Sequence, residues 1–447
     1  MTRRVVITGL GAVTGLGVGM PAMWDALCRG QSALKPITRF DPLGFNSRLG
    51  AEVNGGFSAK EFVPKHYRKA VKVMARDIEL AVVAAKFAVE DAGLVTRGTL
   101  PEGSTDATTY SPDRVGCHVG AGLIAADADE LAMAFSTARR EGEPNRLDLS
   151  TWGSRGMENL TPLWLLKYLP NMLACHVTII HGCEGPSNTI TCAEASGLLS
   201  VGESTRVIER GDADACFSGG AESKLNLMGL LRFEFADRLA ATGDETDGAT
   251  IVRPFDLAAR GGLIGEAGGI VILEEREQAV RRGRPGYAEV AGIGASHSAP
   301  PFARSGGGER DGEGCQCAIE SALDDAEARP TDIDAILPLG SGCTDTDGAE
   351  AAALERVFGP RLADVPIITL APMVGSCAAG TGGMQLAVAA QAVREQRLPA
   401  RLHAGKPRLG IQAGAAESRP ATLRNVLVVT GSLAGQNAAV VLRRVEG

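Results

Sequence analysis

The segment TITCAEASGLLS, residues 189–200, has the layout on which many acyl-transfer enzymes mount a nucleophile. A β-branched run precedes a tight turn of small residues, and a helical pattern follows. A cysteine at the apex would store acyl groups as thioesters, because a helix N-terminus lowers the pKa of a thiol. The apex residue is Glu194, with Cys192 two positions earlier. A carboxylate there would stay ionised, but its acyl product would be a labile mixed anhydride.

Two further patterns that suggest ligand chemistry are weak. Gly9, Gly11 and Gly17 imitate a dinucleotide-binding turn, but their spacing departs from G-x-G-x-x-G and no acidic residue follows about 20 positions later. We expect tight turns there. The ten cysteines have no repeated spacing, and Cys315 and Cys317 are one residue apart rather than two. We expect no metal site and free cysteines that pack as small apolar residues.

The elements that would position these residues alternate along the whole chain. Short β-rich runs and longer helical patterns follow one another, which predicts an α/β fold. The clearest helix runs from Ile78 to a glycine stop at Gly93, and the Gly-, Ser- and Pro-rich segment 296–314 predicts a loop. Candidate strands lie at 4–11, 115–122, 215–223, 268–275, 287–296, 335–342, 426–432 and 438–445.

Length and charge exclude several classes of function. The chain has 447 residues, enough for two or three domains or for one large unit of two similar halves. Its net charge of −8 argues against a general nucleic-acid binder. The N-terminus lacks the apolar core of a signal peptide, and no window reaches a membrane-spanning length. We therefore expect a cytoplasmic protein with neither a nucleic-acid nor a membrane partner.

Six segments, in the order in which a known family has them, cover nearly the whole chain. Together they resemble the β-ketoacyl-acyl-carrier-protein synthase II family of thiolase-like condensing enzymes. The segments are RRVVITGLGAVTGLG at the start, FDPLGFNSRLGAEV at 40–53, PNMLACHVTIIHGCEGPS at 170–187, GDADACFSGGAES at 211–223, RPFDLAARGGLIGEAGGIVILEE at 253–275 and GSLAGQNAAVVL at 431–442.

This resemblance implies a five-layered αβαβα fold, usually dimeric, made of two βαβαβαββ halves. We expect the first half, with cap insertions, at 1–255 and the second at 256–447. In the family, an acyl chain on carrier-protein phosphopantetheine reaches a buried cysteine, and two histidines promote malonyl decarboxylation and stabilise the oxyanion. The resemblance therefore implies no tightly bound cofactor, with phosphopantetheine as the substrate arm if the chain is active.

Alignment of the motifs predicts that the nucleophile and the first histidine are replaced. Counting from GPS places Glu194 at the cysteine position, and making Cys192 the nucleophile would need two deletions before it and two insertions after it. The family's first histidine precedes a D-x-x-E pair, which survives as Asp347 and Glu350. Counting back from this pair places Leu339 at the histidine position.

The remaining motifs predict the same loss. The family's K-S-M-T-G-H reads APMVGS, with Ala371 at the lysine and Ser376 at the second histidine. The near-C-terminal GFGGTN turn reads SLAGQN, which puts Leu433 at the acyl-gating phenylalanine and retains Asn437. Loss of one oxyanion donor costs about 10² to 10³ in rate, so condensation by this chain alone is not expected.

Positive charge collects in the segment that resembles the family's carrier-protein dock. Because carrier proteins are acidic, this segment could steer one toward the chain, and the alternative is a solvated helix face. The predicted docking residues are Lys65, Arg68, Lys69 and Lys72, with Arg76 at the end of the run.

The leading hypothesis is a chain-length factor, the non-condensing subunit of a ketosynthase heterodimer in fatty-acid or polyketide synthesis. This class keeps the fold and the dimer face but replaces the cysteine, commonly with glutamine. Its partners would be an active ketosynthase subunit and acyl carrier protein. The alternatives are a homodimeric enzyme that uses Glu194 for thioester hydrolysis or malonyl decarboxylation, and a module that binds acyl chains or carrier protein.

Overall fold

The computed structural model describes residues 3–53, 56–298, 311–403, 405–412, 414–432 and 434–446. Within them the same succession of strands and helices occurs twice. The first consists of β1 (Val5–Thr14), α2 (Arg76–Ala92), β5 (Val115–Gly120), α5 (Met172–His181), β8 (Ser187–Ile190), α6 (Ser196–Glu209), β9 (Ala215–Ser223) and β10 (Ile264–Glu275). The second consists of β11 (Ala288–His297), α9 (Glu313–Asp325), β12 (Ala335–Leu337), α10 (Thr344–Phe358), α12 (Gly380–Glu395), β15 (Asn425–Gly431) and β16 (Gln436–Arg443), with a bridge at Ile367 in place of one strand.

Strand pairing repeats together with the succession of elements. The first half has the order β8-β5-β9-β10-β1, and the second has β12-β15-β16-β11. The halves join where β1 meets β11, through the pairs Val6–Glu289 and Ile7–Ala288. Because β10 pairs with both β1 and β9, it belongs to the sheet of the first half. The division at residue 255 stays a prediction, and this pairing favours a division between β10 and β11.

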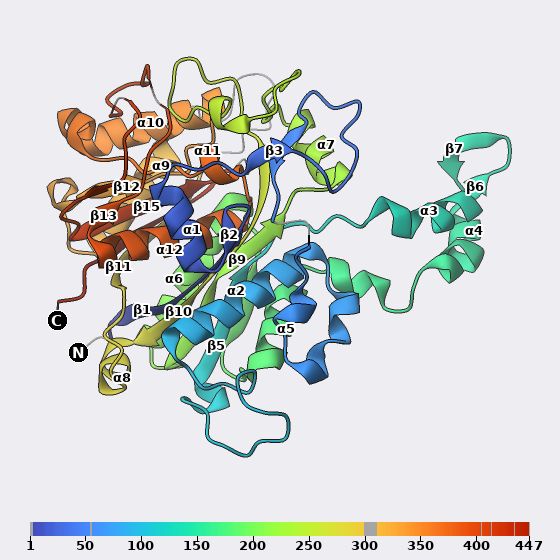
Figure 1. Cartoon of the computed structure of the whole chain (residues 1–447), viewed down its shortest axis with the longest axis horizontal. Helices are drawn as coiled ribbons and strands as arrows, with labels where there is room; N and C mark the ends of the chain where they lie inside the picture. Colours follow the sequence, from blue (N-terminus) through green and yellow to red (C-terminus); the bar gives the residue numbers. More distant parts are fainter. Residues whose placement is uncertain are drawn as a thin grey trace.

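Helices cover both sheets and separate them. α2 and α5 pack on the outer side of the first sheet, and α9 and α10 lie on the outer side of the second. α6 and α12 lie between the two sheets and contact each other (Figure 1). The predicted α/β fold with layers αβαβα is therefore confirmed. Shorter elements complete the chain: β2 (Gly17–Val18), α1 (Met20–Cys28), β3 (Leu34–Pro36), β4 (Leu49–Ala51), α7 (Leu227–Phe235), α8 (Arg276–Arg281), α11 (Ala371–Val374), β13 (Arg397–Leu398) and β14 (Arg419–Pro420).

Gly9 and Gly11 serve packing rather than the tight turn that we expected, whereas Gly17 directly follows the tight turn between β1 and β2. β1 continues through Gly9 and Gly11, and every residue of this strand is buried. A Cβ at Gly11 would lie 1.9 Å from the carbonyl oxygen of Ala84, and one at Gly9 would lie 2.1 Å from that of Ala88. The glycines therefore let α2 approach the strand closely, and no phosphate-binding turn forms there.

The predicted strands lie where expected, with one marked difference. The run 335–342 forms a strand only as far as Leu337. Gly340 and Gly342 have φ values of +50° and +81°, a left-handed conformation that ends a strand. The predicted loop at 296–314 falls mostly outside the described residues, and α9 begins inside it at Glu313.

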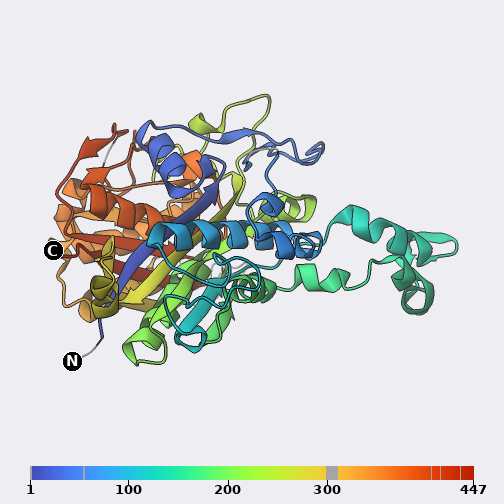
Figure 2. The same cartoon turned by 60° about the horizontal axis from the view of Figure 1, so that its bottom comes forward.

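A long arm leaves the body of the protein between β5 and α5. It contains α3 (Ala128–Thr137), β6 (Arg139–Arg140), β7 (Glu143–Leu147) and α4 (Leu149–Thr151), and it extends far from both sheets in two views (Figures 1 and 2). Ala134 is the only residue of α3 that is buried. In the described part of the chain, no helix is long and apolar enough to cross a membrane, and no group of side chains could hold a metal ion.

Candidate functional site

The turn around Glu194 has the predicted strand-turn-helix form. β8 ends at Ile190, a single 3-10 turn spans Ala193–Ala195, and α6 begins at Ser196. Ala193 has a φ of +48°, so the turn is strained for a residue with a side chain. The Ser196 hydroxyl accepts a hydrogen bond of 2.7 Å from the Cys192 amide and braces the turn. Cys192 itself is half-buried, and burial raises the pKa of its thiol, which does not favour a nucleophile.

Small residues after the turn let α6 approach α12 closely. A Cβ at Gly197 would lie 2.6 Å from the backbone nitrogen of Gly383, and one at Gly382 would lie 2.7 Å from that of Leu198. The two helices therefore cross backbone to backbone in the layer between the sheets. This contact holds the turn that carries Glu194 in place.

Glu194 forms a buried ion pair with Arg238, a residue that no sequence motif identified. The Arg238 guanidinium donates to Oε1 of Glu194 over 2.6 Å, and the residues are 8% and 0% exposed. Burial by itself lowers the pKa of Arg238, but the charges of Glu194 and Cys343 and the hydrogen bonds to them together outweigh this effect, and the pKa stands above its usual value. Oε2 of Glu194 has no hydrogen-bond partner in the described part of the protein.

Arg238 is itself held by the walls of the site. Its guanidinium lies 5.0 Å from the ring centre of Phe233, at the end of α7. Its carbonyl oxygen accepts hydrogen bonds from the Cys343 thiol at 3.2 Å and the Gly262 amide at 2.9 Å. The ion pair therefore joins the turn before α6 to the loop after α7 and to the loop before α10.

Asp347 and Glu350, the pair from which the alignment counts back to Leu339, support the loop that carries Leu339. Glu350 accepts hydrogen bonds from the amides of Leu339 and Gly340 at 2.8 and 2.9 Å. Asp347 accepts from the Ser341 amide and, through its other oxygen, from the Phe255 amide. Burial raises the pKa of Asp347 to about 6 and that of Glu350 to about 8. Both carboxyls serve the backbone, while the Leu339 side chain is buried.

Ser376 lies on the neighbouring wall. Its amide donates to the carbonyl of Leu263, and its own carbonyl accepts from the Gly265 amide at 2.9 Å, so it is tied to the start of β10. Its hydroxyl is buried and has no partner among the described residues. Ala371, at the predicted lysine position, is also buried at the start of α11. These side chains offer neither a cation nor an imidazole.

Two other predicted residues lie near the C-terminus. Asn437, in β16, donates to the Ser298 hydroxyl at 2.8 Å and to the Gly435 carbonyl at 3.1 Å. It therefore holds the turn before its own strand. Leu433, the predicted gate, lies outside the described residues.

The predicted docking segment is exposed but is not a helix face. It forms two short 3-10 turns, Lys65–Tyr67 and Ala70–Val73. The four predicted docking side chains are exposed, and within the described part of the chain none forms an ion pair. Arg76 differs, because it binds the fully buried carboxylate of Glu266 at 2.7 Å.

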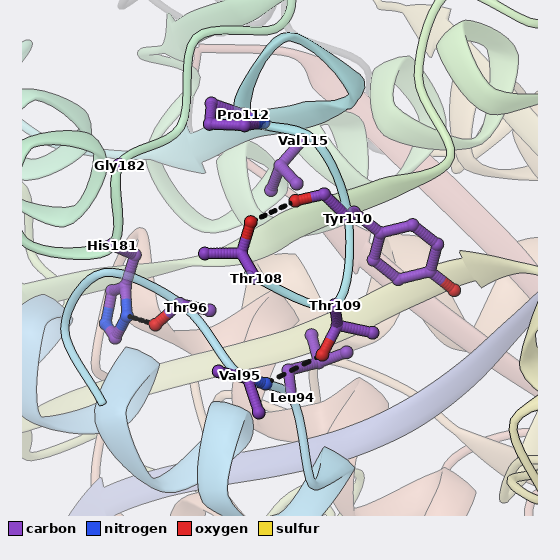
Figure 3. A pocket seen from close by; sticks show the side chains of 10 residues that line it. All are labelled: Leu94, Val95, Thr96, Thr108, Thr109, Tyr110, Pro112, Val115, His181 and Gly182. Atoms are coloured by element: carbon purple, nitrogen blue, oxygen red, sulfur yellow. Dashed lines mark hydrogen bonds between the residues drawn. The ribbon is translucent and has the colours of Figure 1, made fainter. Parts of the chain in front are cut away.

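A small cavity lies away from these residues, between the end of α2 and the end of α5 (Figure 3). Its volume is about 20 Å³, which suits one water molecule and is too small for an acyl chain. The Thr96 hydroxyl lies 2.9 Å from Nδ1 of His181 at its edge, as Figure 3 shows. Burial lowers the pKa of His181 to about 4, so this histidine is a neutral core residue.

Comparisons with known proteins agree along the whole chain. Residues 2–279 match the family model "Beta-ketoacyl synthase, N-terminal domain", and residues 287–405 match "Beta-ketoacyl synthase, C-terminal domain". A Streptomyces cyaneus protein named as a polyketide beta-ketoacyl synthase 1 is 31% identical, over 99% of this chain and 98% of that protein. The 3-oxoacyl-[acyl-carrier-protein] synthase 2 of Staphylococcus aureus strain COL is 28% identical, over 99% of both. The solved structure of "the ishigamide ketosynthase/chain length factor" is 27% identical, with a TM-score of 0.80 and full coverage of both chains.

Proposed function

Because the chain belongs to the beta-ketoacyl synthase family, we propose that it is a non-condensing subunit of the chain-length-factor type that pairs with an active ketosynthase. The observation that carries this proposal is the buried pair of Glu194 and Arg238. A condensing subunit needs a thiolate at this turn and donors for the oxyanion. Here an ion pair fills the turn, and the residues at the predicted histidine positions are Leu339 and Ser376.

The ion pair between Glu194 and Arg238 also argues against the alternative in which Glu194 is a general base. Oε1 of Glu194 already accepts a hydrogen bond from the Arg238 guanidinium, so this oxygen is engaged in a structural contact. Its other oxygen, Oε2, is buried and has no hydrogen-bond partner among the described residues. The geometry therefore favours a structural role for Glu194 over thioester hydrolysis or malonyl decarboxylation.

The arm supports pairing with a second subunit. Its helix α3 is ten residues long and has almost no buried surface, so it gains little stability from its own chain. Large apolar side chains lie exposed along the arm and on the adjacent α5, and a partner of the same fold could cover them. They are Leu123, Met133, Leu149, Met157, Leu163, Leu165 and Ile179.

An open sheet edge lies next to these side chains. β8 is the last strand of its sheet, and Ser187 and Asn188 are exposed there. Free backbone groups at an edge accept a further strand. The similarity to the ishigamide ketosynthase/chain length factor supports an active ketosynthase as the occupant.

The exposed cations at 65–72 support a carrier protein as the second partner. They lack carboxylate partners in the described chain, and acidic surfaces are attracted to such a cluster. The name of the S. aureus relative includes an acyl carrier protein, which agrees with this assignment. We place the heterodimer in the cytoplasm, with phosphopantetheine entering only as the arm of the carrier protein.

Co-expression with an active ketosynthase from the same organism tests the proposal. We expect a 1:1 complex on size-exclusion chromatography and a product length that changes when this chain is exchanged for a homologue. Separate homodimers with an unchanged product length would contradict it. Incubation with acyl- and malonyl-carrier protein, followed by measurement of intact mass, separates the alternatives. Turnover that is abolished in Glu194→Ala would indicate an enzyme. Co-purified lipid without turnover would indicate a binding module.

A further inference from the structure

A second hollow is lined by residues near α8 and the C-terminus. These elements lie on the side of the protein that faces away from the arm (Figures 1 and 2). It is formed by β1, the loop between α8 and β11, the end of α12 and the C-terminal segment. Its volume is about 330 Å³, which is within the range of small-ligand sites. It contains none of the residues assigned above to the ketosynthase-like site.

Three arginines line this hollow, and their side chains are exposed. Within the described residues, the side chains of Arg284, Arg394 and Arg444 form no hydrogen bond or ion pair. The one carboxylate in the lining, Asp91, is already used: it accepts from the Tyr287 hydroxyl and from the Leu10 amide, each at 2.8 Å. The hollow therefore presents three free guanidinium groups on a chain whose net charge is −8.

Capping of helix ends does not account for these arginines. α2 and α12 end beside the hollow, where carbonyl groups attract cations. Other side chains already cap these helix ends. Arg282 donates to the carbonyl of Ala92 at 2.8 Å, and the side-chain amide of Gln396 donates to the carbonyl of Val393 at 2.7 Å. The donors of the three lining arginines remain available to a ligand.

Two of the guanidinium groups contact other groups of the hollow. Arg394 lies over the ring of Tyr287, 5.0 Å from its centre, and the Tyr287 hydroxyl is anchored on Asp91. Arg284 packs against the glycine that ends α2, since a Cβ at Gly93 would lie 2.6 Å from its Nη2. Guanidinium groups favour bidentate contacts to oxyanions.

We propose that this hollow is a binding site for a small organic or inorganic diphosphate. Three guanidinium groups around about 330 Å³ match a ligand with several negative oxygens better than a single carboxylate. The free face of Arg444 would complete the contacts that Arg284 and Arg394 begin. The site is independent of the proposed subunit role.

Isothermal titration calorimetry with sodium pyrophosphate, at constant ionic strength, tests this site in the full chain. We expect saturable binding that becomes roughly tenfold or more weaker in Arg394→Ala and in Arg284→Ala, as for loss of a charge-assisted contact. Arg281→Ala is the matched control, because this exposed arginine on α8 lies outside the hollow. A parallel titration with ADP shows whether a nucleoside adds affinity to the diphosphate.

Several outcomes would overturn the proposal. Absence of saturable pyrophosphate binding would do so, as would an equal loss of affinity in Arg281→Ala, which would indicate attraction to surface charge alone. Binding of an acidic protein through Arg284 and Arg394 without binding of pyrophosphate would assign the hollow to a protein partner instead. Circular dichroism of each variant excludes loss of the fold as the cause of weaker binding.

Discussion

The guanidinium of Arg238 and the carboxylate of Glu194 are 2.6 Å apart and almost completely buried, in the turn to which the motif alignment assigns the nucleophile. The two residues are 44 positions apart in the chain and belong to different loops. Their contact gives the Glu194 carboxylate a structural partner. The first two predictions concern this pair.

Removal of one partner of the pair is expected to destabilise the protein strongly. Arg238→Ala leaves a buried carboxylate without its counter-ion, which typically costs about 3–5 kcal/mol. Replacing both partners with apolar residues, as in Glu194→Leu with Arg238→Met, should recover most of this loss. Thermal unfolding measures the effect, and Arg281→Ala, which removes an exposed ion pair, should leave Tm almost unchanged. A double variant as unstable as Arg238→Ala would contradict this reading.

Restoring the cysteine alone should not restore condensation. Glu194→Cys places a thiol at the turn, but Leu339 and Ser376 supply no imidazole, and each missing oxyanion donor costs about 10² to 10³ in rate. We expect no 3-oxoacyl product from this variant with malonyl- and acyl-carrier protein, as read by intact mass. The variant that also carries Leu339→His, Ser376→His and Ala371→Lys is the comparison. Condensation by Glu194→Cys alone would show that the predicted site assignments are wrong.

An apolar contact on α5 is expected to hold the partner subunit. Ile179 is 62% exposed beside the arm, and Leu257 is equally exposed far from it in the sequence. A charge at a buried interface position is costly, so Ile179→Asp should reduce the fraction of chain that co-purifies with the ketosynthase by about tenfold or more. Leu257→Asp should leave this fraction unchanged. Equal effects of the two variants would argue against α5 as part of the interface.

The exposed cations at 65–72 should control the rate of carrier-protein association. Exchange of Lys65 and Lys69 for glutamate is expected to slow association and to reduce its dependence on salt, because long-range attraction acts mainly on the encounter rate. Surface plasmon resonance at two salt concentrations measures both effects. Lys60→Glu, an exposed position nearby, is the control for general surface charge. An unchanged association rate would leave these residues as a solvated surface.

Asp77 is expected to make stability depend on pH. This carboxyl is 4% exposed at the start of α2, and burial, together with the charge of Glu222, raises its pKa to about 7, from an ordinary value of about 3.9. The folded state binds the Asp77 proton more tightly than the unfolded state does, so protonation of Asp77 stabilises the fold. This contribution is fully present below about pH 4 and is lost as the pH rises through 7. Asp77→Asn keeps the acceptor for the Ser223 amide but cannot ionise.

Tm measured from pH 5 to pH 8 tests the Asp77 prediction. The Tm of Asp77→Asn minus that of the wild type should grow more positive as the pH rises. The exposed Asp244→Asn should show no such trend. A difference that stays constant with pH would mean that Asp77 does not titrate in this range.

Much of the fold could be predicted from local patterns. Alternation of β-rich runs with helical spacing located the strands of both halves, and the motif order identified the layered αβαβα arrangement. These signals are local, because side-chain periodicity reflects which face of an element is buried. Where the prediction was wrong, a contact distant in sequence decided the outcome: Gly9 and Gly11 make room for Ala84 and Ala88 of α2 and do not form a turn.

The sequence by itself determined that Glu194 stands at the apex of the strand-turn-helix elbow, and its spacing from the flanking motifs predicted that it takes the place of a thiol. Only the tertiary structure decided what that carboxylate does. Arg238 belongs to no motif, and a buried charge takes whichever partner the packing brings within reach. The same holds for the arginine-lined hollow, whose three cations lie far apart in sequence and meet only because α12, the α8–β11 loop and the C-terminus converge on β1.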